Sequence, residues 1–376
     1  MRVSVLQDQL ARGLGIVSRA VDSRPTMPVM ANVALATDDS QLRLAAINDK
    51  MSITTYIGAK VDEAGAITLP AKTLNELVNN LSQEHVDLRL DDKTQTVNVR
   101  CGMTVSNIRG ISADEFPLIP DSGDPDVLVP GQTLREMINQ TVFAAAREET
   151  RPILTGVYTH FDGPTLTLAA ADGYRLAVRT AQLEHSIEGS AELVVPAKAL
   201  VEVARIIADD DTVGITLPGE RALVLFYTQN TVISSQLLDG KFPDFGAIIP
   251  KRYTTSTVVY TSDLLRACKR AEIFARDSNY SARIVVQPAT APNEPGEVRV
   301  TGKSAERGDN EGMVDASVEG EAIEVAFNIR YLIDVLSVID DERVIIESMG
   351  AASPGVLRLE DRDDFIHVIM PMSVTK

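Results

Sequence analysis

The chain has 376 residues, of which 44% are hydrophobic, and a formal net charge of −17 at pH 7. This length predicts two or three domains of roughly 100–150 residues each. No run of about 18 apolar residues occurs, which excludes a membrane-spanning helix. The N-terminal residues lack the apolar core and cleavage site of a signal peptide. Two cysteines far apart, Cys101 and Cys268, then fit reduced thiols, so we expect a cytoplasmic protein.

Amphipathic helices and alternating strands follow one another along the chain. The first predicted helix covers residues 8–24, where Leu10, Leu14, Val17 and Val21 fall on one face. Predicted strands follow, as at residues 41–46 and again at 165–170. Pro70 and Pro196 each open a further helix, where a missing N–H costs nothing. The later helices are predicted at residues 70–82, 132–151, 196–208, 262–277 and 328–339.

An internal repeat organises these elements. The segment PAKTLNEL from Pro70 returns as PAKALVEV from Pro196, 126 residues later, and a weaker copy, NIRYLIDV, starts at Asn328. The pairs Phe-Pro, Arg-Pro and Leu-Ala-Ala recur at 124–127 residues in the same order. We therefore predict three domains, at residues 1–124, 125–252 and 253–376. Each is an α+β module of two helices and roughly eight strands in antiparallel sheets.

Positive charge is concentrated in the predicted helices. They hold 14 Lys or Arg and 11 Asp or Glu, a sum of +3, which leaves −20 for the rest of the chain. Arg12 and Arg19 share one helix face, as do Arg266, Lys269 and Arg270. Such a division indicates a basic helical surface and an acidic outer one. The alternative is that surface helices carry Lys and Arg to pair with neighbouring acids.

Catalytic patterns are scarce. The four histidines, His85, His160, His185 and His367, have no metal-ligand spacing to one another or to a cysteine. The Gly13–Ser18 stretch resembles a dinucleotide fingerprint but lies inside a helix. An aspartate run at residues 209–211 is more typical of a solvated loop than of a cation site. We expect no catalytic residue, no metal and no cofactor.

Three stretches together resemble the bacterial DNA polymerase III beta-subunit family, the beta sliding clamps. They are RPTMPVMAN at residues 24–32, ADGYRLA at 171–177, and DGKFPDF at 239–245, followed near the C-terminus by VIMPM at 368–372. The resemblance covers the full length. It implies a non-enzymatic homodimeric ring, assembled head to tail, that encircles double-stranded DNA without sequence preference and confers processivity on the replicative polymerase.

The resemblance also implies two kinds of site. A pocket between the second and third domains would bind peptides from the polymerase alpha subunit, the clamp loader and repair proteins. Its residues would be Leu154, Gly173, Tyr174, Arg175, Leu176, Pro243, Ile248, Val368, Ile369, Met370, Pro371 and Met372. Five residues that the resemblance and the charge pattern nominate would face DNA phosphates: Arg24, Lys72, Arg151, Lys198 and Arg330. Tyr174 replaces the usual His of the family and Ala171 the usual Thr.

The implied dimer interface places Ile273 and Phe274 of the third domain against Ile108 of the first. Met103 and Val105 occupy positions where the family usually carries basic residues, so we expect a less electrostatic interface. Two other functions stay open at this point. One is an enzyme on a repeated α+β scaffold that uses Asp172 and His367, and the other is a repeat scaffold that does not bind DNA.

Overall fold

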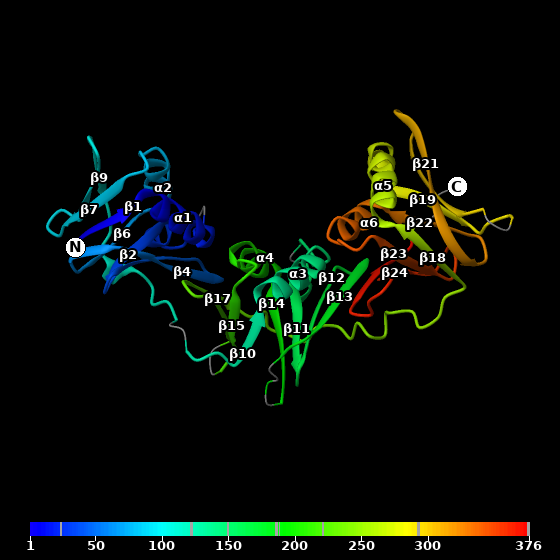
Figure 1. Ribbon diagram of the computed structural model, residues 1–376, viewed down its shortest axis with the longest axis horizontal. Helices are drawn as coiled ribbons and strands as arrows, with labels where there is room; N and C mark the ends of the chain where they lie inside the picture. Colours follow the sequence, from blue (N-terminus) through cyan, green and yellow to red (C-terminus); the bar gives the residue numbers. More distant parts are fainter. Residues whose placement is uncertain are drawn as a thin grey trace. The chain divides into compact units, whose positions relative to one another are not determined.

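The computed structural model describes residues 1–22, 25–120, 123–148, 150–184, 187, 189–219, 222–291 and 294–373. The chain forms two compact units, Met1–Arg135 with Glu202–Leu237 and Glu136–Val201 with Leu238–Lys376 (Figure 1). The division falls inside the central predicted repeat, within helices α3 (Gly131–Val142) and α4 (Ala197–Ile206). Sequence repeats did not predict this division, because it follows strand pairing between neighbouring repeats.

The first unit contains two antiparallel sheets. One has five strands in the order β5 (Lys60–Glu63), β1 (Arg2–Leu6), β7 (His85–Asp91), β8 (Thr96–Cys101) and β9 (Thr104–Arg109). The other has eight, in the order β10 (Val127–Pro130), β15 (Thr212–Thr216), β16 (Leu223–Tyr227), β17 (Thr231–Gln236), β4 (Met51–Gly58), β3 (Gln41–Ile47), β2 (Asn32–Asp38) and β6 (Ala66–Pro70).

The second unit is built on one antiparallel sheet of twelve strands. Its first half is β14 (Ser190–Pro196), β11 (Gly156–Asp162), β12 (Thr165–Ala171), β13 (Arg175–Gln182), β25 (Phe365–Ile369) and β24 (Gly355–Leu359). Its second half is β23 (Arg343–Ser348), β18 (Thr255–Tyr260), β21 (Gly308–Gly320), β20 (Gly296–Ser304), β19 (Ser281–Gln287) and β22 (Ile323–Asn328).

The remaining α-helices are α1 (Gln7–Val17), α2 (Ala71–Asn79), α5 (Thr261–Ala275) and α6 (Ile329–Leu336). Short 3-10 turns are η1 (Ser18–Ala20), η2 (Pro28–Ala31), η3 (Ala113–Glu115), η4 (Pro152–Thr155) and η5 (Arg276–Ser278). Helix α5 packs on β20 and β21 through the predicted face, where Leu264, Cys268 and Ala271 are fully buried. Helix α1 buries Leu10, Leu14 and Val17 as expected. The α+β prediction with antiparallel sheets is confirmed.

Helix α3 is shorter than the predicted 132–151. It ends at Val142, where the Thr141 hydroxyl donates to the Met137 carbonyl at 2.8 Å. A hydroxyl that bonds back to its own helix weakens continuation of that helix. Beyond it, the Ala146 amide donates to the Leu154 carbonyl at 2.8 Å, so the chain turns toward η4 instead.

Candidate functional site

A cleft of about 720 Å³ lies in the second unit. Its wall is formed by the segment after α3, by the turn between β12 and β13, and by the start of α6. Leu154, Gly173, Tyr174 and Arg175, four predicted pocket residues, line it. Two predicted DNA-facing residues line the same cleft, Arg151 and Arg330. The fold therefore brings together candidates that the sequence had assigned to different sites.

The turn between β12 and β13 explains the Asp-Gly pair in its sequence. The Asp172 carboxylate accepts hydrogen bonds from the amides of Tyr174 and Arg175 at 2.9 and 3.0 Å. Gly173 has a φ of +92°, a conformation that costs a residue with a Cβ atom. This tight turn leaves Tyr174 projecting, with 65% of its surface exposed at the cleft.

Arg175 fixes the position of this turn relative to α6. Its side chain is buried, and it donates to Asp172 at 3.0 Å, to Asp334 at 2.6 Å and to the Phe143 carbonyl at 2.7 Å. The guanidinium carbon also lies 4.3 Å from the centroid of the Tyr331 ring. Charge-assisted bonds of this kind are strong and directional. Arg175 thus holds the cleft wall with its hydrogen-bonding groups already engaged.

The other predicted pocket residues divide into a buried and an exposed set. Leu154, Leu176 and Val368 belong to one core cluster with Phe242, and Ile369 is buried in the neighbouring core. Met370 is 40% exposed, and its amide donates to the Tyr174 carbonyl at 2.8 Å. Pro371 and Met372 are half-buried, and Pro243 and Ile248 are exposed beside the clustered Phe242, Phe245 and Ile249. Pairing of β13 with β25 places Leu176 opposite Val368.

Sequence reasoning missed several cleft residues: Arg147, Tyr280, Asn328, Tyr331 and Asp334. The repeat did carry a signal for Tyr331. It stands where the first two copies of the helix motif have Thr73 and Ala199. A large aromatic side chain at the start of this helix, where the other copies have small side chains, is the signal that could have nominated Tyr331 as a site residue.

The predicted DNA-facing residues differ in their surroundings. Arg24 lies outside the described residues. Lys72 is almost fully exposed, 4.0 Å from Glu76, and Lys198 and Arg151 are exposed. Arg330 is more constrained, because its guanidinium pairs with Glu272 at 3.1 Å and stacks 3.7 Å from the Tyr280 centroid.

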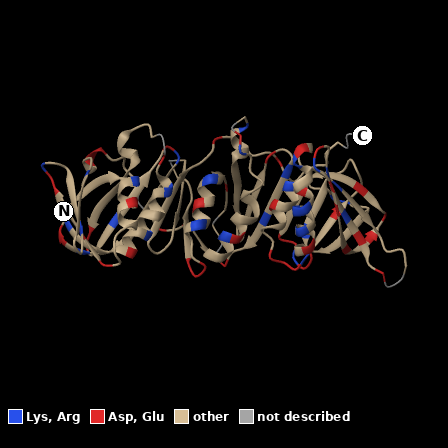
Figure 2. Cartoon of the chain, turned by 90° about the horizontal axis from the view of Figure 1, so that it is seen from above, with Lys and Arg blue, Asp and Glu red and all other residues tan. Residues whose placement is uncertain are grey.

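The charge excess of the helices is smaller than the predicted bounds suggested. As bounded by the structure, α1 to α6 hold 9 basic and 7 acidic residues, a sum of +2. Figure 2 shows basic and acidic positions interspersed along the helices. Five of the nine basic residues lie within 4.0 Å of an acidic partner: Lys72, Arg135, Arg205, Arg266 and Arg330. Most of these cations therefore have acidic neighbours, so helix charge by itself is modest support for DNA binding.

The predicted interface residues lie on two elements. Ile108 is buried on β9, whereas Met103 and Val105 beside it are exposed. Ile273 is exposed on α5 and Phe274 is half-buried. The contact of Ile273 and Phe274 with Ile108 would lie between two copies of the chain, so their role stays a prediction.

His367 has surroundings that do not suit acid–base catalysis. It is fully buried on β25, with its ring 5.4 Å from that of Phe143. Burial and the nearby Arg175 charge lower its pKa from 6.5 to about 3, although the Leu176 main chain weakly favours the charged form. Asp172, its supposed partner, is engaged with Arg175. Among the described residues, no group of three or more His, Cys, Asp or Glu side chains could hold a metal ion.

Comparison with known proteins gives a consistent result over the whole length. The sequence matches the N-terminal, central and C-terminal domains of the DNA polymerase III beta subunit at residues 1–120, 128–244 and 246–373. It is 33% identical over 381 residues to the beta sliding clamp of Synechococcus elongatus, covering 100% of both chains. It is 30% identical over 382 residues to that of Bacillus subtilis, covering 99% of each.

Solved structures agree. The Bacillus subtilis DNA polymerase sliding clamp superposes with a TM-score of 0.92 at 28% identity, covering 100% of both chains. A Pseudomonas aeruginosa sliding clamp bound to griselimycin gives 0.90, also at 28% identity and full coverage. Within the described residues, no helix has the length and apolar character needed to cross a bilayer. The chain belongs to the bacterial DNA polymerase III beta-subunit family, the beta sliding clamps.

Proposed function

We propose that two copies of this chain close head to tail into a ring around duplex DNA, and that the ring tethers the replicative polymerase and other partners through the cleft of the second unit. Membership of the family supports a role as a DNA polymerase sliding clamp. The closed ring is proposed from a strand pairing that recurs between successive repeats. Two strand edges, one in the first repeat and one in the third, lack this pairing within the described residues.

The recurring pairing joins the last strand of one repeat to an inner strand of the repeat before it. β17, the last strand of the second repeat, pairs with β4 of the first. β25, the last strand of the third, pairs with β13 of the second. β4 and β13 hold the same place in their repeats, each being the third strand after the first helix of the repeat.

Two strand edges lack this pairing within the described part of the chain. β9 is the last strand of the first repeat and pairs only with β8. β21 is the third-repeat counterpart of β4 and β13, and its residues 308–315 pair on one side only, with β20. Unpaired backbone N–H and C=O groups at a long edge are a template for another strand.

Joining β9 of one copy to β21 of another would repeat the internal pairing between molecules. Such an interface is heterologous, and it closes into a ring when the rotation between copies allows closure. The exposed Met103, Val105 and Ile273 would add apolar area beside the paired strands. Three repeats in each of two chains would supply six domains, as the family resemblance implies.

Enclosure explains why weak DNA contacts suffice. Non-specific binding through phosphates has a Kd of roughly 10⁻⁴–10⁻⁶ M, too weak to hold a polymerase through thousands of steps. A closed ring leaves DNA only by opening or by passing an end. Lys72, Arg151, Lys198, Arg330 and Arg24 would then centre the duplex through phosphate contacts, which carry no sequence information.

The cleft supplies the partner site. Tyr174 presents exposed surface at the cleft, and Met370, also partly exposed, is bonded to the Tyr174 carbonyl. Leu154 lines the cleft and belongs to a core cluster with Leu176 and Val368. A few buried aliphatic or aromatic anchors carry most of the affinity at such interfaces, and a flexible Met side chain adapts to varied partners. Polymerase, clamp-loader and repair proteins would dock short peptides here.

Sedimentation equilibrium tests the assembly. The wild-type chain is expected at twice its mass of 40.7 kDa. Replacing Ile273 and Phe274 together with Asp is expected to give monomers, whereas Leu128→Asp, an exposed apolar residue on β10, is the control that should leave the dimer intact. A wild-type monomer, or a double variant that still sediments as a dimer, would contradict the proposed interface.

A further inference from the structure

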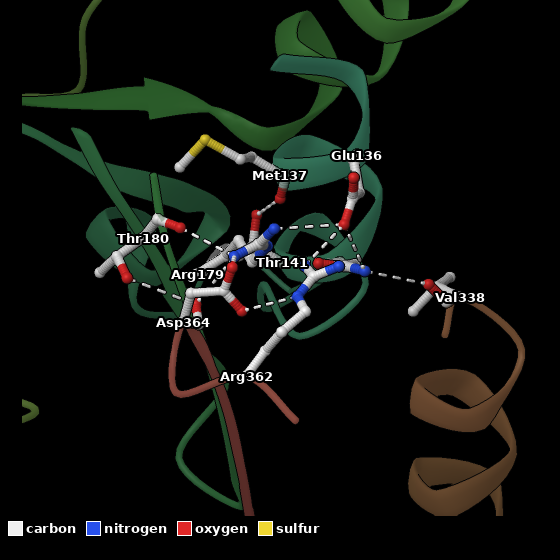
Figure 3. A network of polar contacts seen from close by, with 9 residues as sticks. Glu136, Met137, Thr141, Arg179, Thr180, Val338, Arg362 and Asp364 are labelled. Carbon is white, nitrogen blue, oxygen red and sulfur yellow. Dashed lines mark hydrogen bonds and ion pairs between the residues drawn. The ribbon is translucent and has the colours of Figure 1, made fainter. Parts of the chain in front are cut away.

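Four charged side chains form a closed circuit where β13 meets the segment that leads into β25 (Figure 3). The charged tetrad consists of Glu136, Arg179, Arg362 and Asp364. Arg179 pairs with Asp364 and, at 3.2 Å, with Glu136. Arg362 pairs with the same two acids, at 3.2 Å to Asp364 and 3.0 Å to Glu136. Opposite charges therefore alternate around the circuit.

The tetrad ties together segments that are distant in sequence. Glu136 comes from α3, Arg179 from β13, and Arg362 and Asp364 from the connection between β24 and β25. The Asp364 carbonyl also accepts from the Thr180 amide at 2.8 Å and from the Arg179 guanidinium at 3.2 Å. Asp364, the residue directly before β25, is thus held through both its side chain and its main chain.

An arginine stands at each end of the pairing between β13 and β25. Arg179 lies opposite Phe365, and Arg175 lies opposite Ile369. Residues four apart on a strand share a face of the sheet. Arg175 secures the end next to the cleft through Asp334 and Phe143, and Arg179 secures the other end through the tetrad. β25 then continues directly into Met370, whose amide donates to the carbonyl of the cleft-lining Tyr174.

The tetrad centres on a buried arginine, and its other three side chains are about a third exposed. Such a group of charges is a poor way to gain stability alone. The Arg179 side chain is 6% exposed, and its Nε has no hydrogen-bond partner among the described residues. Desolvation offsets much of the attraction in such groups, and apolar replacements are often as stable. What alternating charges supply, and an apolar contact does not, is one preferred geometry. A one-residue slip of β25 would break the contacts of Arg179 with Asp364 and of Glu136 with Arg362.

We infer that the charged tetrad is a positioning device: Arg179, Glu136, Arg362 and Asp364 fix the register of β25 on β13 and so hold Met370 and its neighbours in the geometry that binds a partner peptide. This inference rests on the proposed function of the cleft. Among the residues that the structure describes, the polar partners of Arg179 are Thr180, Asp364 and Glu136, which do not line the cleft. Arg179 acts through β25, so it is a positioning residue.

The test compares peptide affinity with stability. Arg179→Met keeps the length and apolar stem of the side chain but removes the charge, and Glu136→Gln is a milder variant that leaves the pair of Arg179 with Asp364. Two matched controls lie on β19, six strands from β25 in the sheet. Arg283→Met removes an exposed ion pair with Glu324, and Ile284→Ala lowers stability by removing buried side-chain volume.

Affinity is measured by fluorescence polarisation of a labelled synthetic peptide carrying the clamp-binding segment of the polymerase from the same organism. Hydrogen exchange of residues 366–372 is followed in parallel. Arg179→Met is expected to weaken binding on the order of tenfold and to speed that exchange. Glu136→Gln should have the same effects to a smaller degree. The β19 controls should leave affinity and hydrogen exchange unchanged, even if their melting temperatures fall as far as that of Arg179→Met. Arg179→Lys should partly restore affinity.

Unchanged affinity and unchanged exchange in both Arg179→Met and Glu136→Gln would overturn the inference. A loss of affinity equal to that of Ile284→Ala at the same melting temperature would also overturn it, since general destabilisation would then suffice. If the wild type itself binds no peptide, the proposed function of the cleft fails instead. In that case the hydrogen exchange of residues 366–372 is by itself the test of the positioning role, and unchanged exchange in Arg179→Met would overturn it.

Discussion

His367 makes the stability of the second unit depend on pH in a way that can be calculated. It sits on β25 between the two arginines of β13, opposite Ala177, and is fully buried against Phe143. The charged group that acts on it is Arg175 on β13, which itself pairs with Asp334 on α6. Its pKa falls from 6.5 to about 3, first through burial and then through Arg175.

The sign follows from proton binding. Between pH 6.5 and 3 the unfolded chain holds a proton on this imidazole and the folded chain does not, so acidification favours unfolding. The contribution of His367 to stability is therefore present above pH 6.5 and is lost as pH falls toward 3. At about 1.4 kcal/mol per pKa unit, the full effect is roughly 5 kcal/mol. The part lost between pH 7 and pH 5 is about 2 kcal/mol.

His367→Leu isolates this effect. Leucine has a similar volume and does not titrate, so the change at pH 7 should be within about 1.5 kcal/mol. Urea unfolding is followed by circular dichroism, since the chain contains no tryptophan. Between pH 7 and pH 5 the wild type should lose about 2 kcal/mol more than the variant, because every other titrating group is shared. Parallel pH dependences would show that His367 titrates normally in the folded state and would refute the reasoning.

Three further substitutions test the cleft. Met370→Ala should weaken binding of a polymerase peptide by about tenfold with little change in melting temperature, because the side chain is partly exposed; Met349→Ala, also exposed and outside the cleft lining, is the control. Gly173→Ala should cost about 1 kcal/mol by thermal melting, because its φ of +92° disfavours a Cβ atom. Gly163→Asn should be tolerated better, because the φ of Gly163 is +54°, which Asn readily adopts. Arg175→Ala should cost about 3 kcal/mol in urea unfolding by leaving Asp172 and Asp334 without their cation, and a loss under 1 kcal/mol would show that water replaces it.

Periodicity predicted the helices and their buried faces well. Leu10, Leu14 and Val17 on α1, and Leu264, Cys268 and Ala271 on α5, are buried as expected, because helical spacing directly reports which face meets the sheet. Val21 is only half-buried, since α1 ends at Val17 and a 3-10 turn follows. Membership of the family confirms the prediction of a non-catalytic clamp subunit. His367, the strongest candidate for an enzyme, is a buried core residue.

The cleft could be predicted only in part. The family resemblance, and not a local pattern, nominated Gly173, Tyr174 and Arg175; the turn that presents them depends on local effects, the φ of Gly173 and the Asp172 cap. The contacts of Arg175 with Asp334 and Phe143, and the charged tetrad, join segments separated by up to 226 residues, so no local pattern encodes them. The helix charge of +3 falls to +2 because the helices are shorter than predicted, and acids on neighbouring elements also pair with Arg135 and Arg330.

Retention on DNA tests the proposal of enclosure most directly. The chain is loaded onto a nicked circular plasmid by its clamp loader and ATP, passed through gel filtration at moderate salt, and compared with an identical sample cut once by a restriction enzyme after loading. The ring should remain on the circle and leave the linear DNA, because only the linear molecule has an end to pass. Equal retention on both, or equal loss from both, would mean that the chain binds DNA by contact and would contradict the account.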